Sequence, residues 1–295
     1  MADRRATRAG GRTVRFRLLS IVAVAVVASC THDAAGDRTL RADSDSAAAA
    51  AAADSAAARR SDPLSDVARA IAPQTPYQVE DVSDPGSIRG VITLDSVPTL
   101  HDTTLSGDEA EVCGTRIPDR SVLHAGRDLE GALVWVSDAR QGRPLTRDRR
   151  AELAIVRCQF VPRMLALVQG TTINLQSKDA TVHHTHFYSE SEGELLSRML
   201  TVDRWAVVPS ARIAAQPGLV RVRLNRHPYV RGFVAVFDHP YFAVTNRYGR
   251  FSISGLPAGT YRVRVWHERA DSVIEREVTV KSGRAATLDA TLALR

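Results

Sequence analysis

Residues Leu219–Tyr241 read Leu-Val-Arg-Val-Arg-Leu-Asn-Arg-His-Pro-Tyr-Val-Arg-Gly-Phe-Val-Ala-Val-Phe-Asp-His-Pro-Tyr, and this stretch decides how the chain folds. Apolar residues alternate with arginines over Val220–Leu224, which is the period of a half-buried strand. Pro228 ends that strand directly after His227, because proline lacks the backbone N–H that a strand needs. A second apolar strand is predicted at Phe233–Phe237. A histidine where a strand passes into a loop is at a common position for a metal ligand, so His227 is a candidate site residue.

Short runs in which apolar and polar residues alternate continue on both sides of this stretch. Turn residues separate these runs, and this spacing is typical of antiparallel sandwiches or barrels. Strands are predicted near residues 88–92, 132–136, 153–156, 165–168, 172–175, 242–245, 251–253, 261–266, 272–280 and 286–294. Gly193–Leu200 is predicted as a short helical turn. The predicted fold class is all-β, with two sandwiches.

The charge of the chain argues against a nucleic-acid partner. The 295 residues carry a formal net charge of +6, from 39 lysines and arginines against 33 acidic residues. The basic residues are mostly arginines spread between acids, whereas a nucleic-acid groove would gather them on one element. We therefore expect no nucleic-acid binding.

The N-terminus has the pattern of an export signal. Arginines precede an apolar run, Leu18–Ala28, which is too short to span a bilayer comfortably. The run ends in Val-Ala-Ser-Cys30, which resembles the lipobox of bacterial lipoproteins. That resemblance implies lipid on Cys30, a membrane anchor, and a periplasmic or outer-membrane-associated location. The alternative is a conventional secretory signal in which Cys30 is incidental.

Residues 1–29 are thus expected to be a signal peptide, and residues 30–84 a disordered tether. The tether is rich in Ala, Ser, Asp and Pro, and Ser44–Ala58 contains no apolar residue large enough to form a core.

Apart from Cys30 the chain has two cysteines, Cys113 and Cys158. In an exported protein an even pair is most simply explained by a disulfide. The competing use is as two thiolate ligands of a metal, but the pair lacks the short C-x2-C spacing of zinc ribbons.

Two segments resemble the ligand segments of cupredoxins of the amicyanin and plastocyanin type. One is Asp-Ala-Thr-Val-His-His-Thr-His-Phe (179–187), and the other is Leu-Asn-Arg-His-Pro-Tyr-Val (224–230). The resemblance covers about residues 150–232 and implies a Greek-key sandwich. It places His183 and His227 at the two histidine ligand positions.

The same resemblance places Leu224 at the cysteine position and Val230 at the methionine position of the copper site. Without the thiolate a blue-copper centre cannot form. Three interpretations of the histidines stay open. The site is a relic filled by apolar side chains, or a ligand pocket without metal, or a thiolate-free site that holds Cu(II) or Zn(II). The ligands of that last site would be His183, His227 and a third histidine, His186 or else His184.

The third segment that resembles a known family is Asn246–Val265, Asn-Arg-Tyr-Gly-Arg-Phe-Ser-Ile-Ser-Gly-Leu-Pro-Ala-Gly-Thr-Tyr-Arg-Val-Arg-Val. It is similar to the carboxypeptidase-regulatory-like module, a transthyretin-like sandwich grouped with carbohydrate-binding-like folds. The resemblance covers about residues 231–295, and an alternative extends it to the strand at Gly86–Val97 and its partner at Ala132–Val136. Gly249 and Gly259 are predicted to take positive φ in its turns.

The expected organisation is a cupredoxin-like sandwich over residues 85–230 and a carboxypeptidase-regulatory-like sandwich over residues 231–295. No catalytic sequence motif is present, so a non-enzyme is expected. The predicted function is binding or scaffolding at the cell envelope, without a cofactor. The partner would be an envelope protein or a glycan, although carbohydrate binding rests on fold analogy alone. The alternative is the thiolate-free metal protein.

Overall fold

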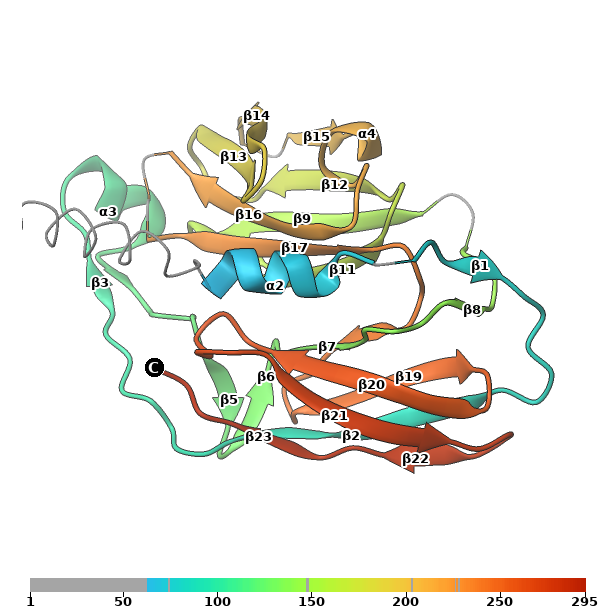
Figure 1. Ribbon diagram of the computed structural model, residues 1–295. Helices are drawn as coiled ribbons and strands as arrows, with labels where there is room; N and C mark the ends of the chain where they lie inside the picture. Colours follow the sequence, from blue (N-terminus) through green and yellow to red (C-terminus); the bar gives the residue numbers. More distant parts are fainter. Residues whose placement is uncertain (1–62, 74, 147–148, 203, 226, 228) are drawn as a thin grey trace, which may run out of the picture. The chain divides into compact units, whose positions relative to one another are not determined.

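The computed structural model describes residues 63–73, 75–146, 149–202, 204–225, 227 and 229–295. These residues form mostly β-structure in several sheets, which confirms the predicted all-β class (Figure 1). The predicted signal peptide, Cys30 and most of the predicted tether lie outside the described residues. Within the described ranges, no helix has the length and apolar character needed to cross a bilayer.

One sandwich is built from a single segment, residues 150–237, and we call it the continuous sandwich. Its four-stranded sheet has the order β10 (Gln159–Val161), β9 (Arg150–Val156), β12 (Thr172–Ser177), β15 (Trp205–Val208). Its five-stranded sheet has the order β11 (Met164–Val168), β17 (Arg231–Phe237), β16 (Gly218–Leu224), β13 (His183–Ser189), β14 (Gly193–Leu200). Buried apolar residues from both sheets form one cluster, so each sheet buries one face against the other.

The other sandwich is built from two segments, residues 86–136 and 242–292, and we call it the split sandwich. One sheet has the order β18 (Phe242–Val244), β7 (Leu133–Val136), β20 (Gly259–Trp266), β21 (Ile274–Val280). The other has the order β19 (Arg250–Leu256), β2 (Gly86–Leu94), β6 (Asp128–Glu130), β5 (Leu123–Ala125), and β22 (Ala285–Thr287) and β23 (Ala290–Leu292) also pair with β2.

The remaining elements are short. Two-residue strands pair as β1 (Gln78–Val79) with β8 (Gln141–Gly142), and as β3 (Thr103–Thr104) with β4 (Arg116–Ile117). The helices are α2 (Pro63–Ile71), α3 (Asp108–Cys113) and α4 (Ser210–Ile213).

Strand β17 is buried on both of its faces. Val234 and Val236 belong to the core of the continuous sandwich, while Phe233 and Phe237 belong to the apolar cluster of the split sandwich. The ring centroid of Phe233 lies 5.9 Å from that of Trp266. A strand covered on both faces has no polar side to alternate with, which explains the unbroken apolar run from Phe233 to Phe237. The stretch Leu219–Tyr241 therefore joins the two sandwiches, as its sequence indicates.

The sheets do not follow the predicted division of the chain at residue 231. Strand β17 lies inside the five-stranded sheet of the continuous sandwich, between β11 and β16. In turn, β2 and β7, which fall within the predicted first domain, pair with β19 and β20 of the second. Periodicity cannot reveal this grouping, because β19 and β20 lie more than 100 residues away from β2 and β7 along the chain. It agrees with the alternative that extends the carboxypeptidase-regulatory-like resemblance to Gly86–Val97 and Ala132–Val136.

The structure also departs from three local expectations. Helix α2, Pro63–Ile71, lies in the predicted tether, and Val67 and Ile71 bury one side of it because apolar residues recur three to four positions apart. Gly193–Leu200 is not a helical turn but strand β14, which pairs with β13. Gly249 has the expected positive φ, 64°, whereas Gly259 does not; the neighbouring Gly255 has φ 82° instead.

Candidate functional site

Strand β13 sets the positions of three neighbouring histidines. Side chains alternate between its two faces, so His183 points inward and is 2% exposed, while His184 and His186 point to the other face. The rings of His184 and His186 have centroids 4.3 Å apart, and His186 Nδ1 pairs with Glu194 at 3.1 Å. The predicted ligand set of His183, His186 and His227 is therefore not brought together: His186 lies on the wrong face of its strand.

The carboxylate of Asp179 holds His183 in place. Asp179 accepts a hydrogen bond from His183 Nε2 at 2.8 Å, so the imidazole proton lies on Nε2. The carboxylate also accepts the backbone N–H groups of Arg157 and Cys158, at 2.6 and 2.7 Å. Burial raises the pKa of Asp179, but these hydrogen bonds outweigh it and leave the pKa below its usual range.

Arg157 and Cys158 form the two-residue turn of the β9–β10 hairpin. Both have positive φ, 49° and 56°, as a type I′ turn requires, although neither residue favours that region. The Asp179 carboxylate binds both turn amides and so compensates for the unfavourable conformation. The usual Asn-Gly signal is absent, so the sequence pattern does not reveal this turn.

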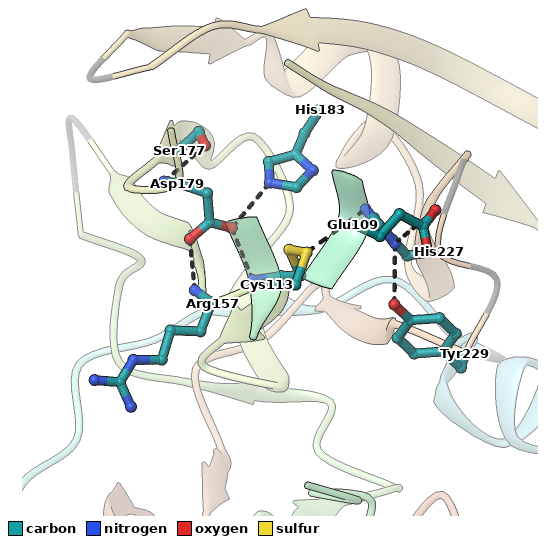
Figure 2. The surroundings of a disulfide bond; sticks show 9 residues. Glu109, Cys113, Arg157, Ser177, Asp179, His183, His227 and Tyr229 are labelled. Carbon is teal, nitrogen blue, oxygen red and sulfur yellow. Dashed lines mark hydrogen bonds and ion pairs between the residues drawn. A yellow bond between two sulfur atoms is a disulfide. The ribbon is translucent and has the colours of Figure 1, made fainter. Parts of the chain in front are cut away.

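Cys113 and Cys158 form a disulfide, the pairing that the sequence analysis favours (Figure 2). Their Cα atoms are 5.4 Å apart, within the normal range for a disulfide. Cys113 is the last residue of α3, so the bond ties this helix to the hairpin turn that Asp179 holds. With Leu105 and Ile117 the two cysteines make a small apolar cluster.

His227 lies on the other side of the disulfide. Its Nε2 is 3.9 Å from Cys113 Sγ, and its Nδ1 is 3.0 Å from the Tyr229 hydroxyl. Glu109, on α3, approaches Nδ1 to 3.8 Å. Burial, together with the charge of Glu109, raises the pKa of Tyr229. The ring centroids of His227 and His183 are 5.8 Å apart, so the two histidines predicted as a pair do meet (Figure 2).

We call this group the disulfide–histidine cluster: Cys113, Cys158, Asp179, His183 and His227. It does not fit a blue-copper centre. Leu224 and Val230, at the positions where cupredoxins carry sulfur ligands, are each 2% exposed and belong to the apolar core. Neither side chain has an atom that can bind a metal.

A second candidate site is a cavity of about 510 Å³ that is rich in arginine. Residues from both sandwiches line it, including Tyr229, Trp266 and the charged residues Asp119, Arg120, Arg163, Arg231, Glu268, Arg269 and Arg295. Nothing in the sequence pattern predicted it, because these residues are far apart in the chain.

The charges around this cavity are unbalanced. Arg163 binds both carboxylate oxygens of Glu268, and Arg295 pairs with Asp271. Arg120 and Arg231 form no ion pair with any described residue.

The electrostatic effects of these arginines are visible in two neighbouring groups. Burial, with the charges of Arg163 and Arg269, lowers the pKa of His267 to about 3. Burial raises the pKa of Glu268, and the surrounding arginines only partly offset this effect. The cavity therefore presents an excess of positive charge in a partly buried setting.

Exposed aromatic side chains are few in the described residues. Trp135 and Trp266 are fully buried, whereas Trp205 on the edge strand β15 is 61% exposed and Tyr248 is 43% exposed. These two do not belong to one element or one sheet, so they do not form the aromatic platform that sugar binding would favour.

Solved structures and one family model show similarity to parts of this chain. A reduced amicyanin mutant is similar with a TM-score of 0.27 and 20% identity, over 31% of this chain and 85% of that one. A purple cupredoxin from Nitrosopumilus maritimus is similar with a TM-score of 0.25 and 18% identity, over 29% of this chain and 98% of that one. No curated protein matches the sequence. Residues 206–293 match the carboxypeptidase regulatory-like domain, and this region runs from β15 through β16 and β17 into the split sandwich.

Proposed function

We propose that this protein is a non-catalytic binding protein of the cell envelope, and that it holds an anionic ligand in the arginine-rich cavity. The observation that carries the proposal is the pair Arg120 and Arg231, which line the cavity and form no ion pair with any described residue. Guanidinium groups bind carboxylates and phosphates through two parallel hydrogen bonds, so these are the ligand groups that the site fits.

The shape of the site supports a ligand larger than a single anion. A cavity of about 510 Å³ is within the usual size of small-molecule sites. Tyr229, which is partly exposed, adds aromatic surface to the arginine lining. An acidic glycan fits this combination, and it agrees with the envelope partner expected from the sequence.

Calorimetry with an acidic oligosaccharide, such as oligogalacturonate, tests this proposal against a neutral oligosaccharide of the same length. We expect saturable binding of the acidic ligand that weakens with added salt, and loss of that binding in Arg231→Gln and Arg120→Gln. Arg276→Gln, on β21 and outside the cavity, is the matched control and should bind normally. Equal binding of the neutral sugar, or unchanged binding by both cavity variants, would contradict the proposal. Chromatography of the recovered ligand should find it unaltered, as a non-enzyme requires.

The envelope location is part of the same proposal and rests on Cys30. Lipid on this residue would anchor the exported protein to a membrane without crossing it. In a bacterial host the protein should sediment with membranes, and Cys30→Ser should shift it to the soluble fraction. Mass spectrometry of the N-terminal peptide should find the lipid, and an unmodified Cys30 in the mature protein would refute the anchor.

A further inference from the structure

We propose that reduction of the Cys113–Cys158 disulfide converts the disulfide–histidine cluster into a zinc site, with Cys113, Cys158, His227 and His183 as ligands. The bond then acts as a redox gate: the oxidised protein binds no zinc here, and the reduced protein does. This proposal does not depend on the anionic ligand proposed above, which occupies a different site.

The donor atoms lie close together. The Cys113 and Cys158 sulfurs and a His227 ring nitrogen all lie within 4.8 Å of one another, and so do donor atoms of Cys158, Asp179 and His183. Cys158 belongs to both groups, and the proposal therefore puts the ion beside its sulfur. All five residues are buried.

One edge of the cluster already fits zinc geometry. Zinc bonds of about 2.3 Å to sulfur and about 2.0 Å to nitrogen, in a tetrahedron, place these two atoms roughly 3.5 Å apart. The distance between Cys113 Sγ and His227 Nε2 is 3.9 Å, within a few tenths of an ångström of that value. The two sulfurs, bonded in the oxidised protein, must separate to about 3.8 Å around the ion, and reduction of the disulfide permits this.

Asp179 orients His183 through a hydrogen bond. Zinc-bound histidines commonly donate the proton of their other ring nitrogen to a carboxylate, which fixes the tautomer and orientation of the ring. The His183–Asp179 hydrogen bond already has this arrangement: Nε2 carries the proton, and Nδ1 holds the lone pair for a metal. Figure 2 shows His183 between Asp179 and the region of His227.

The gate follows from sulfur chemistry. In the disulfide neither sulfur is a thiolate, and zinc binds the thiolate form. The thiolate of a dithiol reductant attacks one protein sulfur, forms a mixed disulfide and releases the other protein sulfur as a thiolate. The reductant's second thiolate then attacks the reductant sulfur of the mixed disulfide and releases the remaining protein thiolate. The reductant becomes a disulfide, and the two protein thiolates take up protons as thiols. These thiols lose their protons when zinc binds.

Zinc titration of the full-length protein tests the proposal, with Cys30→Ser as the background so that Cys113 and Cys158 are its only cysteines. A phosphine reduces the disulfide in one sample and is omitted from the other. We expect about one zinc per chain in the reduced sample, measured by competition with a chromophoric chelator, and none in the oxidised sample. Replacing zinc by Co(II) should add the charge-transfer absorption of a thiolate ligand.

Variants that keep both cysteines test the other proposed residues without removing the disulfide from the folded protein. His227→Gln removes a proposed ligand, and Asp179→Asn should weaken zinc binding about 10- to 100-fold, as loss of a partner of a ligating histidine typically does. His184→Gln, on the opposite face of β13, is the matched control and should bind zinc normally. Circular dichroism of each reduced variant confirms that it is folded.

Two results would overturn the proposal. One is a reduced, folded protein that takes up no zinc. The other is equal uptake by the oxidised protein, which would favour the thiolate-free histidine site instead.

Discussion

Acidification should destabilise the folded protein through two buried histidines, His239 and His267. They are 5% and 4% exposed. Burial lowers the pKa of His239 to about 4, and burial with the charges of Arg163 and Arg269 lowers that of His267 to about 3, both from a usual value of 6.5. The perturbation is a change of pH from about 7.5 to about 5, where the unfolded chain takes up protons on these residues and the folded chain does not.

The sign follows from the direction of the pKa shifts. Between the folded and unfolded pKa values the unfolded state binds more protons, so the free energy of unfolding rises with pH and falls on acidification. At about 1.36 kcal/mol per pKa unit, each histidine should lower the free energy of unfolding by on the order of 2 kcal/mol at about pH 5. The two together should lower it by on the order of 4 kcal/mol.

The structure also supplies a variant that removes the titration and keeps the local hydrogen bond. His239 Nδ1 accepts the N–H of Tyr241 at 3.1 Å, and His267 Nδ1 accepts the N–H of Arg269 at 3.2 Å. An asparagine oxygen can accept the N–H two residues ahead in the same way. His239→Asn and His267→Asn should therefore fold, and they do not titrate.

Urea denaturation of the wild type, each single variant and the double variant at both pH values measures the effect. The change in unfolding free energy between the two pH values is compared, because lost ring packing will also lower stability at about pH 7.5. Each substitution should remove about half of the acid sensitivity. Glu268, whose pKa is raised by burial, contributes in the opposite direction but is present in every protein. Equal pH-dependent losses in wild type and double variant would refute this reasoning.

Three further substitutions test single contacts. Gly90→Ala should destabilise the protein by about 1–3 kcal/mol or more, because its Cβ would collide with the Leu288 carbonyl group, and a lower melting temperature measures this. Asp179→Asn should lower the free energy of unfolding of the oxidised protein by about 1–3 kcal/mol, measured by urea denaturation, because one oxygen cannot accept both turn amides; an unchanged value would contradict that role. Trp205→Ala should change it by no more than about 0.5 kcal/mol, since this side chain is 61% exposed, and a larger loss would reveal packing that the structure lacks.

Features that depend on local pattern were predictable. Val220, Val222 and Leu224 alternate with arginines, and all three are buried in the core as that alternation predicts. The disulfide also followed from the sequence, because only Cys113 and Cys158 remain once Cys30 is set aside. The inward position of His183 near His227 was expected from a family resemblance.

Features that depend on distant partners were not predictable. Asp179 stands four residues before His183 in the sequence. It also accepts hydrogen bonds from the backbone of Arg157 and Cys158 in the β9–β10 turn, and no sequence pattern indicates those contacts. The separation of His186 from His183, in contrast, follows from a local pattern, the alternation of side chains along β13, and was predictable.

The sequence by itself determined the all-β class, the positions of most strands and the types of side chain present in Leu219–Tyr241. These follow from periodicity and turn residues, which act over a few positions. A family resemblance, and not periodicity, indicated that β2 and β7 join the C-terminal strands. Only the tertiary structure decided that β17 serves both sandwiches and that scattered arginines line one cavity. Those outcomes depend on which sheet edges and apolar faces meet, and pairings across more than 100 residues leave no periodic trace in the sequence.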